Sequence, residues 1–198
     1  MLYPLFIPTY GMTLFCMVYS NHWMQLTAKW WAVLIGSTFV ITCVIPMSAI
    51  WILMRQRAVK DWYIEAAQER TTPYIYTLLS FGFWCVMLLR LHVPAYLSIP
   101  AIGATVALFG VTLINLRWKI SAHLCALGGL TGGMFGLCLG LGIMPSLWVV
   151  GAFLAAALLL MYARLYLNAH TDWQVIAGYG LGLVCTFLPV WIGYGWLK

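Results

Sequence analysis

Two short polar stretches carry the side chains of this protein that are best suited to chemistry. Residues 117–123 and 163–178 each join two apolar segments, and each combines a cation with a histidine. The pairs are Lys119 with His123 in the first stretch and Arg164 with His170 in the second. Arginine and lysine bind phosphate oxygens, and two histidines can act as a nucleophile and a general acid. These residue types therefore predict chemistry on a phosphate group.

A third polar stretch, residues 55–72, includes Arg70 shortly before Pro73. Two apolar segments separate it from the His123 stretch, and two more separate that stretch from His170. Since two membrane crossings return a chain to the side from which it started, we expect all three stretches on one side of a membrane. The predicted phosphate-binding residues are Arg70, Lys119, Ser121 and Arg164.

The composition predicts a membrane protein. Of the 198 residues, 64% are hydrophobic and 7% are charged, whereas a soluble domain carries about 25% charged residues. The length suits one all-α polytopic bundle of six to seven transmembrane helices, which would form a single domain over residues 1–198. There is no polar domain to carry the net charge of +6, which argues against a nucleic-acid partner and favours phosphate groups at the surface of the lipid bilayer.

Neither a metal nor another cofactor is expected. The six cysteines lie in apolar segments without a CxxC pair, as is typical of buried structural cysteines. Only four acidic residues are present, and they do not supply the carboxylate cluster of a two-metal phosphatase. Attack by a histidine on phosphorus, with cations stabilising the transition state, is the chemistry that remains.

The predicted spans are residues 30–54, 73–90, 94–115, 124–143, 147–163 and 173–197. Residues 2–19, interrupted by prolines, form either a short first span or a re-entrant segment. Residues 55–72 are expected to form an amphipathic interfacial helix. Pro46 is expected to kink its span, and Pro73 to occupy the first turn of the next. Glycines four residues apart between 128 and 140 predict a close helix contact.

The polar stretches resemble the motifs of the type 2 phosphatidic acid phosphatase (PAP2) superfamily of membrane lipid phosphatases. Ile120-Ser121-Ala122-His123 resembles the PSGH motif of that family. Ala163-Arg164, followed after five residues by His170 and after three more by Gln174, resembles its SR…H…D motif. Glu69-Arg70-Thr71-Thr72-Pro73 is a loose match to its basic K…RP motif. The resemblance covers about residues 55–182 and implies a PAP2-like helix bundle.

The resemblance also implies a role for each residue of the site. His170 would attack phosphorus and form a phosphohistidine, and His123 would protonate the leaving oxygen. The phosphate would be held by Arg70, Lys119, Ser121 and Arg164. Gln174 departs from the family pattern, because it stands where an aspartate orients the nucleophilic histidine. A glutamine oxygen can accept the imidazole N–H but does not stabilise an imidazolium as a carboxylate does.

The function expected from these residues is that of a metal-independent lipid phosphate phosphatase. Its substrate would be a phosphorylated membrane lipid, such as polyprenyl diphosphate, phosphatidic acid, phosphatidylglycerophosphate or lipid A phosphate. The alternative is a weak or inactive PAP2-like protein that binds phospholipid headgroups. A transporter or channel is disfavoured, because the titratable residues lie at span ends rather than at the middle of the membrane, where transport sites usually lie.

The side of the membrane that the site faces is judged from two opposing indications. Seven lysines and arginines lie on the side of the polar stretches and three on the other, which favours the cytoplasm. Without Arg70, Arg117, Lys119 and Arg164, which lie in or beside the predicted site, three remain on each side. The family resemblance favours the periplasm or outside, for a protein of the bacterial inner membrane.

Overall fold

The structure is a computed structural model that describes residues 4–22, 26–60, 64 and 67–195. The described residues form helices and no strand. In chain order the elements are η1 (Pro4–Phe6), α1 (Ile7–His22), α2 (Ala28–Phe39), the π-helix η2 (Val40–Val44), α3 (Ile45–Arg55), α4 (Ala67–Arg90), α5 (Ala95–Asn115), α6 (Ala122–Leu141), α7 (Leu147–Tyr166) and α8 (Asp172–Gly195). The predicted all-α polytopic bundle is confirmed.

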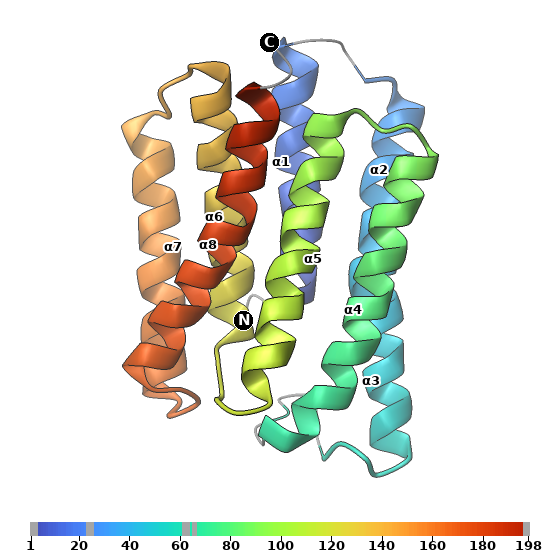
Figure 1. Ribbon diagram of the computed structural model, residues 1–198, viewed down its shortest axis with the longest axis vertical. Coiled ribbons are helices and arrows are strands. Elements are labelled where there is room, and N and C mark those ends of the chain that lie inside the picture. Colours follow the sequence, from blue (N-terminus) through green and yellow to red (C-terminus); the bar gives the residue numbers. More distant parts are fainter. Residues whose placement is uncertain (1–3, 23–25, 61–63, 65–66, 196–198) are drawn as a thin grey trace.

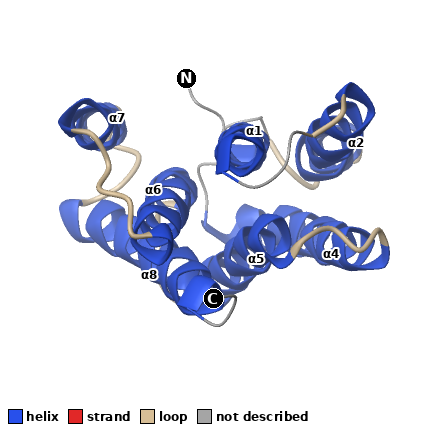
Figure 2. Cartoon of the chain, turned by 90° about the horizontal axis from the view of Figure 1, so that it is seen from above, coloured by secondary structure: helices blue, strands red, loops and turns tan. Residues whose placement is uncertain are grey.

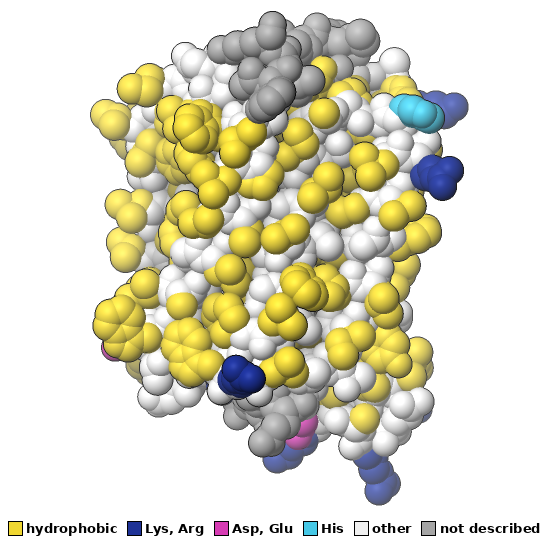
Figure 3. All heavy atoms as spheres, viewed as in Figure 1, with side chains coloured by type: hydrophobic (Ala, Val, Ile, Leu, Met, Phe, Trp, Pro, Cys, Tyr) yellow, Lys and Arg dark blue, Asp and Glu magenta, His cyan; other side chains and the backbone are white. Residues whose placement is uncertain are grey.

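Six helical stretches of the described chain are long and apolar enough to cross a membrane. They are Ala28–Arg55, Glu69–Arg90, Ala95–Asn115, Ala122–Leu141, Leu147–Tyr166 and Asp172–Gly193. The apolar helix Pro4–Val18 is shorter, and α1 begins part-way along the bundle rather than at its end (Figure 1). Figure 3 shows the visible face covered by hydrophobic side chains between two ends that carry the charges. The protein is an integral membrane protein.

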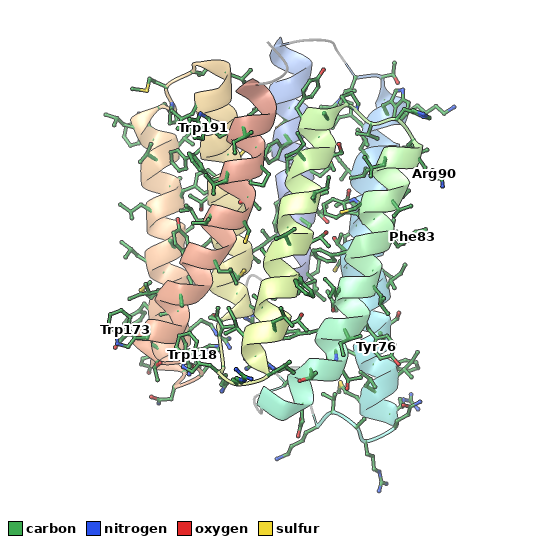
Figure 4. All side chains as sticks on the ribbon, in the orientation of Figure 1. Tyr76, Phe83, Arg90, Trp118, Trp173 and Trp191 are labelled. Carbon is green, nitrogen blue, oxygen red and sulfur yellow. The ribbon has the colours of Figure 1, made fainter. Side chains whose placement is uncertain are left out.

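Helix α8 is the centre of the arrangement. It packs against α6 on one side and α5 on the other, and α4 continues the row beyond α5 (Figure 2). Helix α7 lies outside α6, and α1 packs against α6, α5 and α2 from the opposite face. Trp118 and Trp173 lie near one end of the bundle and Trp191 towards the other (Figure 4), as expected of side chains at the two membrane interfaces.

The contact between α6 and α8 is the tightest in the bundle, and its cause is glycine. A Cβ atom added at Gly128 or Gly132 would run into a backbone carbonyl of α8, Tyr179 O or Leu183 O. A Cβ atom added at Gly182 of α8 would run into Cys125 O of α6. The predicted glycine face is therefore confirmed as a packing surface, and it holds α6 and α8 in a fixed register.

The span around Pro46 contains a π-helix as well as the proline. The N–H of Ile45 bonds to the carbonyl of Val40, five residues back, so that the carbonyl of Ile41 is released from the helix. The Ser80 hydroxyl of α4 donates to Ile41 O, and Trp84 Nε1 donates to Thr38 Oγ1 at 3.0 Å. These contacts connect the π-helical turn to α4 inside the bundle.

One of the two predictions about the segment before α4 is wrong. Pro73 does not lie in the first turn, because α4 starts at Ala67 and carries the proline inside it. The missing N–H of proline bends a helix, and Figure 1 shows the first turns of α4 inclined to the rest. The described part of residues 55–72 forms a turn after Arg55 and then the start of α4. The interfacial helix stays a prediction, because residues 61–63 and 65–66, in the middle of that stretch, lie outside the described residues.

Candidate functional site

The three polar stretches meet at one end of the bundle. The start of α4, the connection from α5 to α6 and the connection from α7 to α8 all lie at the lower end in Figure 1. This arrangement confirms that the stretches share one side. Arg164, expected in a loop, instead occupies the last turn of α7, because that helix runs three residues beyond its predicted end.

Charged side chains in this cluster are buried to an unusual degree. Arg70 is 6% exposed and Arg164 is 8% exposed, whereas arginine is normally at the protein surface. Arg70 Nε donates to the carbonyl of Ile64 at 2.6 Å. Burying an ion is unfavourable unless polar groups compensate for the lost hydration. Two buried arginines at one end of a bundle therefore form a strongly positive environment.

His170 lies inside this environment and is held by two acceptors. Its Nδ1 atom is 3.1 Å from Gln174 Oε1 and 3.2 Å from the carbonyl oxygen of Lys119. The N–H of Thr171 donates to the same Gln174 oxygen at 3.2 Å, which identifies that atom as the oxygen of the amide. Since both neighbours of Nδ1 are acceptors, Nδ1 carries the hydrogen and Nε2 is the unprotonated nitrogen of the neutral ring.

The surroundings of His170 keep its imidazole neutral. Its pKa is lowered from 6.5 to about 4, first by burial and next by the positive charge of Arg70. Arg164 and Lys119 act in the same direction, and the hydrogen bond with Gln174 opposes them. At neutral pH the site therefore presents fixed cations beside an uncharged imidazole.

Ser121 serves the fold in a way that the sequence motif does not reveal. It is fully buried as the N-cap of α6, where its Oγ accepts the N–H of Leu124 at 3.5 Å. Its own N–H donates to the carbonyl of Gln174 at 3.2 Å. These bonds join the start of α6 to the start of α8, so Ser121 positions the cluster. A phosphate-binding role for its hydroxyl stays a prediction.

A cavity of about 200 Å³ leads from the cluster into the bundle. Arg70, His123 and Arg164 are among its lining residues, whereas Lys119, Ser121 and His170 are not. Most of the remaining wall is apolar. The lining includes positions from Arg70 to Trp84 on α4, a stretch of roughly 21 Å at 1.5 Å per residue. The cavity is therefore long and apolar, with cations at one end.

The sequence did not lead us to predict this cavity, although one signal for it is present. Its α5 wall includes Ala101, Ala104 and Ala107, which follow one another at three-residue intervals. Small side chains at helical spacing leave room beside a helix. No group of three or more histidine, cysteine or acidic residues that could hold a metal ion occurs in the described part of the chain.

One curated protein similar to this chain is a membrane permease. The chain is 31% identical over 115 residues to the vitamin B12 import system permease protein BtuC of Klebsiella pneumoniae subsp. pneumoniae, a match that covers 53% of this chain and 34% of the permease. The chain thus spans about a third of the length of that protein. No protein-family model matches the chain, and no solved structure matches it.

This similarity overturns the predicted function. A permease carries its substrate across a membrane, so the predictions of a hydrolase and of a phosphorylated membrane lipid as its substrate are wrong. The physical reason for the error is that cations and histidines which stabilise a phosphoryl transition state also bind an anion without cleaving it. The resemblance to the PAP2 motifs stays a prediction.

Proposed function

We propose that this chain is the membrane-embedded part of a transport system and that its cavity binds a small organic anion. The observation that carries the proposal is the similarity to a permease protein over 115 residues. The chain covers a third of that permease, so transport, the substrate and any partner subunits are all part of the proposal.

The shape of the cavity supports a transport site. Transport sites usually lie near the middle of the membrane, whereas the titratable residues of this chain lie at span ends. The cavity, however, begins at Arg70 and Arg164 and includes Trp84, well inside α4. A molecule bound to the arginines would place its remaining atoms towards the middle of the bundle.

The lining of the cavity supports an anion with an apolar body. Two arginines and one histidine form its polar end, and no carboxylate occurs among the lining residues of the described chain. The volume of about 200 Å³ is below the roughly 300–1,000 Å³ of pockets for drug-sized ligands. Vitamin B12 is larger than such ligands, so we propose a substrate smaller than the one named for the permease of Klebsiella.

We propose a location in the bacterial inner membrane, with the cluster end towards the outside. An importer first binds its substrate on the outer side, which supports this orientation. Among the described residues, Arg55, Arg57, Lys60 and Arg117 are exposed at the cluster end and Lys29 and Arg90 at the other, a difference of two charges that opposes this orientation only weakly. Labelling of Asp172→Cys, in a variant without the native cysteines, by a membrane-impermeant reagent on intact cells tests the orientation.

Uptake into proteoliposomes tests the transport proposal. The purified chain would be reconstituted and supplied with radiolabelled benzenesulfonate, with vitamin B12 and the cation benzyltrimethylammonium as comparisons. We expect saturable uptake of the sulfonate alone, lost in Arg164→Gln and retained in Arg117→Gln, whose side chain is exposed at the same end. Absence of sulfonate binding by the folded protein, or release of inorganic phosphate from phenyl phosphate, would contradict the proposal.

A further inference from the structure

We propose that the cluster binds its anion together with a proton, which is held on Nε2 of His170. This inference rests on the proposed anion site and adds to it a coupling between substrate and proton. A site of this kind would draw on a proton gradient to accumulate its substrate. The ligand class is an oxyanion whose negative charge persists at the pH where the imidazole is protonated, such as a sulfonate.

The hydrogen bonds of His170 select the atom that takes up the proton. Nδ1 lies 3.1 Å from Gln174 Oε1 and 3.2 Å from Lys119 O, and both are acceptors. The hydrogen on Nδ1 is therefore fixed, and Nε2 is the one ring nitrogen with a lone pair to accept a proton. The ring does not have to flip or change tautomer when the proton arrives.

The charges around His170 make protonation depend on the ligand. Arg70 of α4, Arg164 of α7 and Lys119 before α6 all act on it as cations, and His123 of α6 is a second titratable group that interacts with it. Gln174 of α8, the side-chain acceptor, is neutral, and Asp172 is exposed. His170 does not line the cavity, whereas Arg70 and Arg164 do. An anion held by these arginines would therefore act on the ring through charge, by cancelling their repulsion and favouring the imidazolium.

The sign of the pH dependence follows from thermodynamic linkage. The empty site binds the proton weakly, because burial and the three cations hold the pKa of His170 at about 4. An anion in the site raises that pKa, so anion binding takes up a proton and becomes tighter as the pH falls. The dissociation constant should fall by up to roughly tenfold per pH unit between the two pKa values. At high pH the same site would release its anion.

Calorimetry on the full chain in detergent tests the coupling, with benzenesulfonate as the probe because its sulfonate does not titrate between pH 5.5 and 8. Binding would be measured in bis-tris and in imidazole, cationic buffers of different ionisation enthalpy that do not compete for an anion site. We expect proton uptake approaching one per bound sulfonate and a rising affinity towards low pH. His170→Gln should bind the sulfonate with a pH-independent affinity.

The variants distinguish failure of the coupling from failure of the site. His92→Gln, an exposed histidine at the opposite end, should behave as the unmodified chain does. Binding without proton uptake in the unmodified chain would overturn the coupling and leave the anion site intact. Unchanged pH dependence in His170→Gln, with loss of that dependence in His123→Gln, would overturn the assignment to His170. Absence of sulfonate binding at every pH would overturn the anion site itself.

Discussion

The imidazole of His170 lies 3.1 Å from the amide oxygen of Gln174, four residues further on in the first turn of α8. That acceptor fixes the hydrogen on Nδ1 and carries no charge of its own. A carboxylate at the same place would stabilise an imidazolium. With an amide there, the charge of His170 depends on the cations around it and on any ligand among them.

A charged acceptor at this position should therefore change the titration of His170. In Gln174→Glu we expect the pKa of His170 to rise from about 4 by roughly one to three pH units, because a carboxylate within about 4–6 Å favours the imidazolium. An NMR titration with labelled histidine would measure it, with His92 as an internal reference. An unchanged pKa would show that the side chain at position 174 does not bond to the ring.

The two buried arginines should dominate affinity for an anion. Charge-assisted hydrogen bonds contribute about 1.5–3 kcal/mol each, so Arg70→Gln and Arg164→Gln should each weaken binding of benzenesulfonate by roughly ten- to a hundredfold. Arg117→Gln removes an exposed arginine from the same end and should change the affinity little, since exposed charges are screened. Equal losses in all three variants would indicate attraction by net charge rather than a defined site.

Much of this architecture could be predicted from the order of polar and apolar residues. The burial of apolar side chains in a bilayer requires helices of about 20 residues, and the parity of the crossings predicts that Arg70, His123 and Arg164 lie at one end. The pairing of His170 with Gln174 is also local, because His170 lies two residues before α8 and Gln174 lies in the first turn of that helix.

Other features depended on contacts between distant segments. The π-helical turn at Val40–Val44 is hydrogen-bonded to Ser80 of α4, and Thr38 is hydrogen-bonded to Trp84 of the same helix. The cavity arises where small residues of α5 face α1, α4 and α6. Ser121 caps α6 because that helix begins at Ala122, two residues before its predicted start. Function was mispredicted for a related reason, because the side chains that bind an anion do not reveal whether it is cleaved or carried.

The neutral state of His170 should make the stability of the protein depend on pH. The folded pKa of about 4 lies below the unfolded value of 6.5, so below pH 6.5 the unfolded chain binds a proton that the folded chain does not. Stability should therefore decline as the pH falls from 6.5 towards 4. After a discount for solvent screening, we expect a loss of about 1 kcal/mol between pH 7.5 and 5.

Thermal unfolding in detergent, at several pH values and without added anions, measures this decline. His170→Gln removes the titrating ring and keeps a side chain that can donate a hydrogen bond, so its unfolding should depend less on pH. His92→Gln provides the matched control, because that histidine is exposed at the opposite end. If His170→Gln loses stability towards low pH as steeply as the unmodified chain, another group is responsible for the effect.

The contact between α6 and α8 should tolerate no side chain at Gly182. A Cβ atom there would run into the carbonyl of Cys125, so the two helices must separate in Gly182→Ala, at a cost of about 1–3 kcal/mol for overpacking. Because this contact sets the positions of Ser121 and Gln174, the variant should also weaken anion binding.

Gly180→Ala is the matched control on the same helix, since a Cβ atom there meets nothing within 4 Å, and alanine should raise helix stability slightly. Thermal unfolding and calorimetry of the pair would measure both effects. Equal stability of the two alanine variants would mean that α6 and α8 are not in close contact at Gly182. The glycines would then not be what positions the cluster.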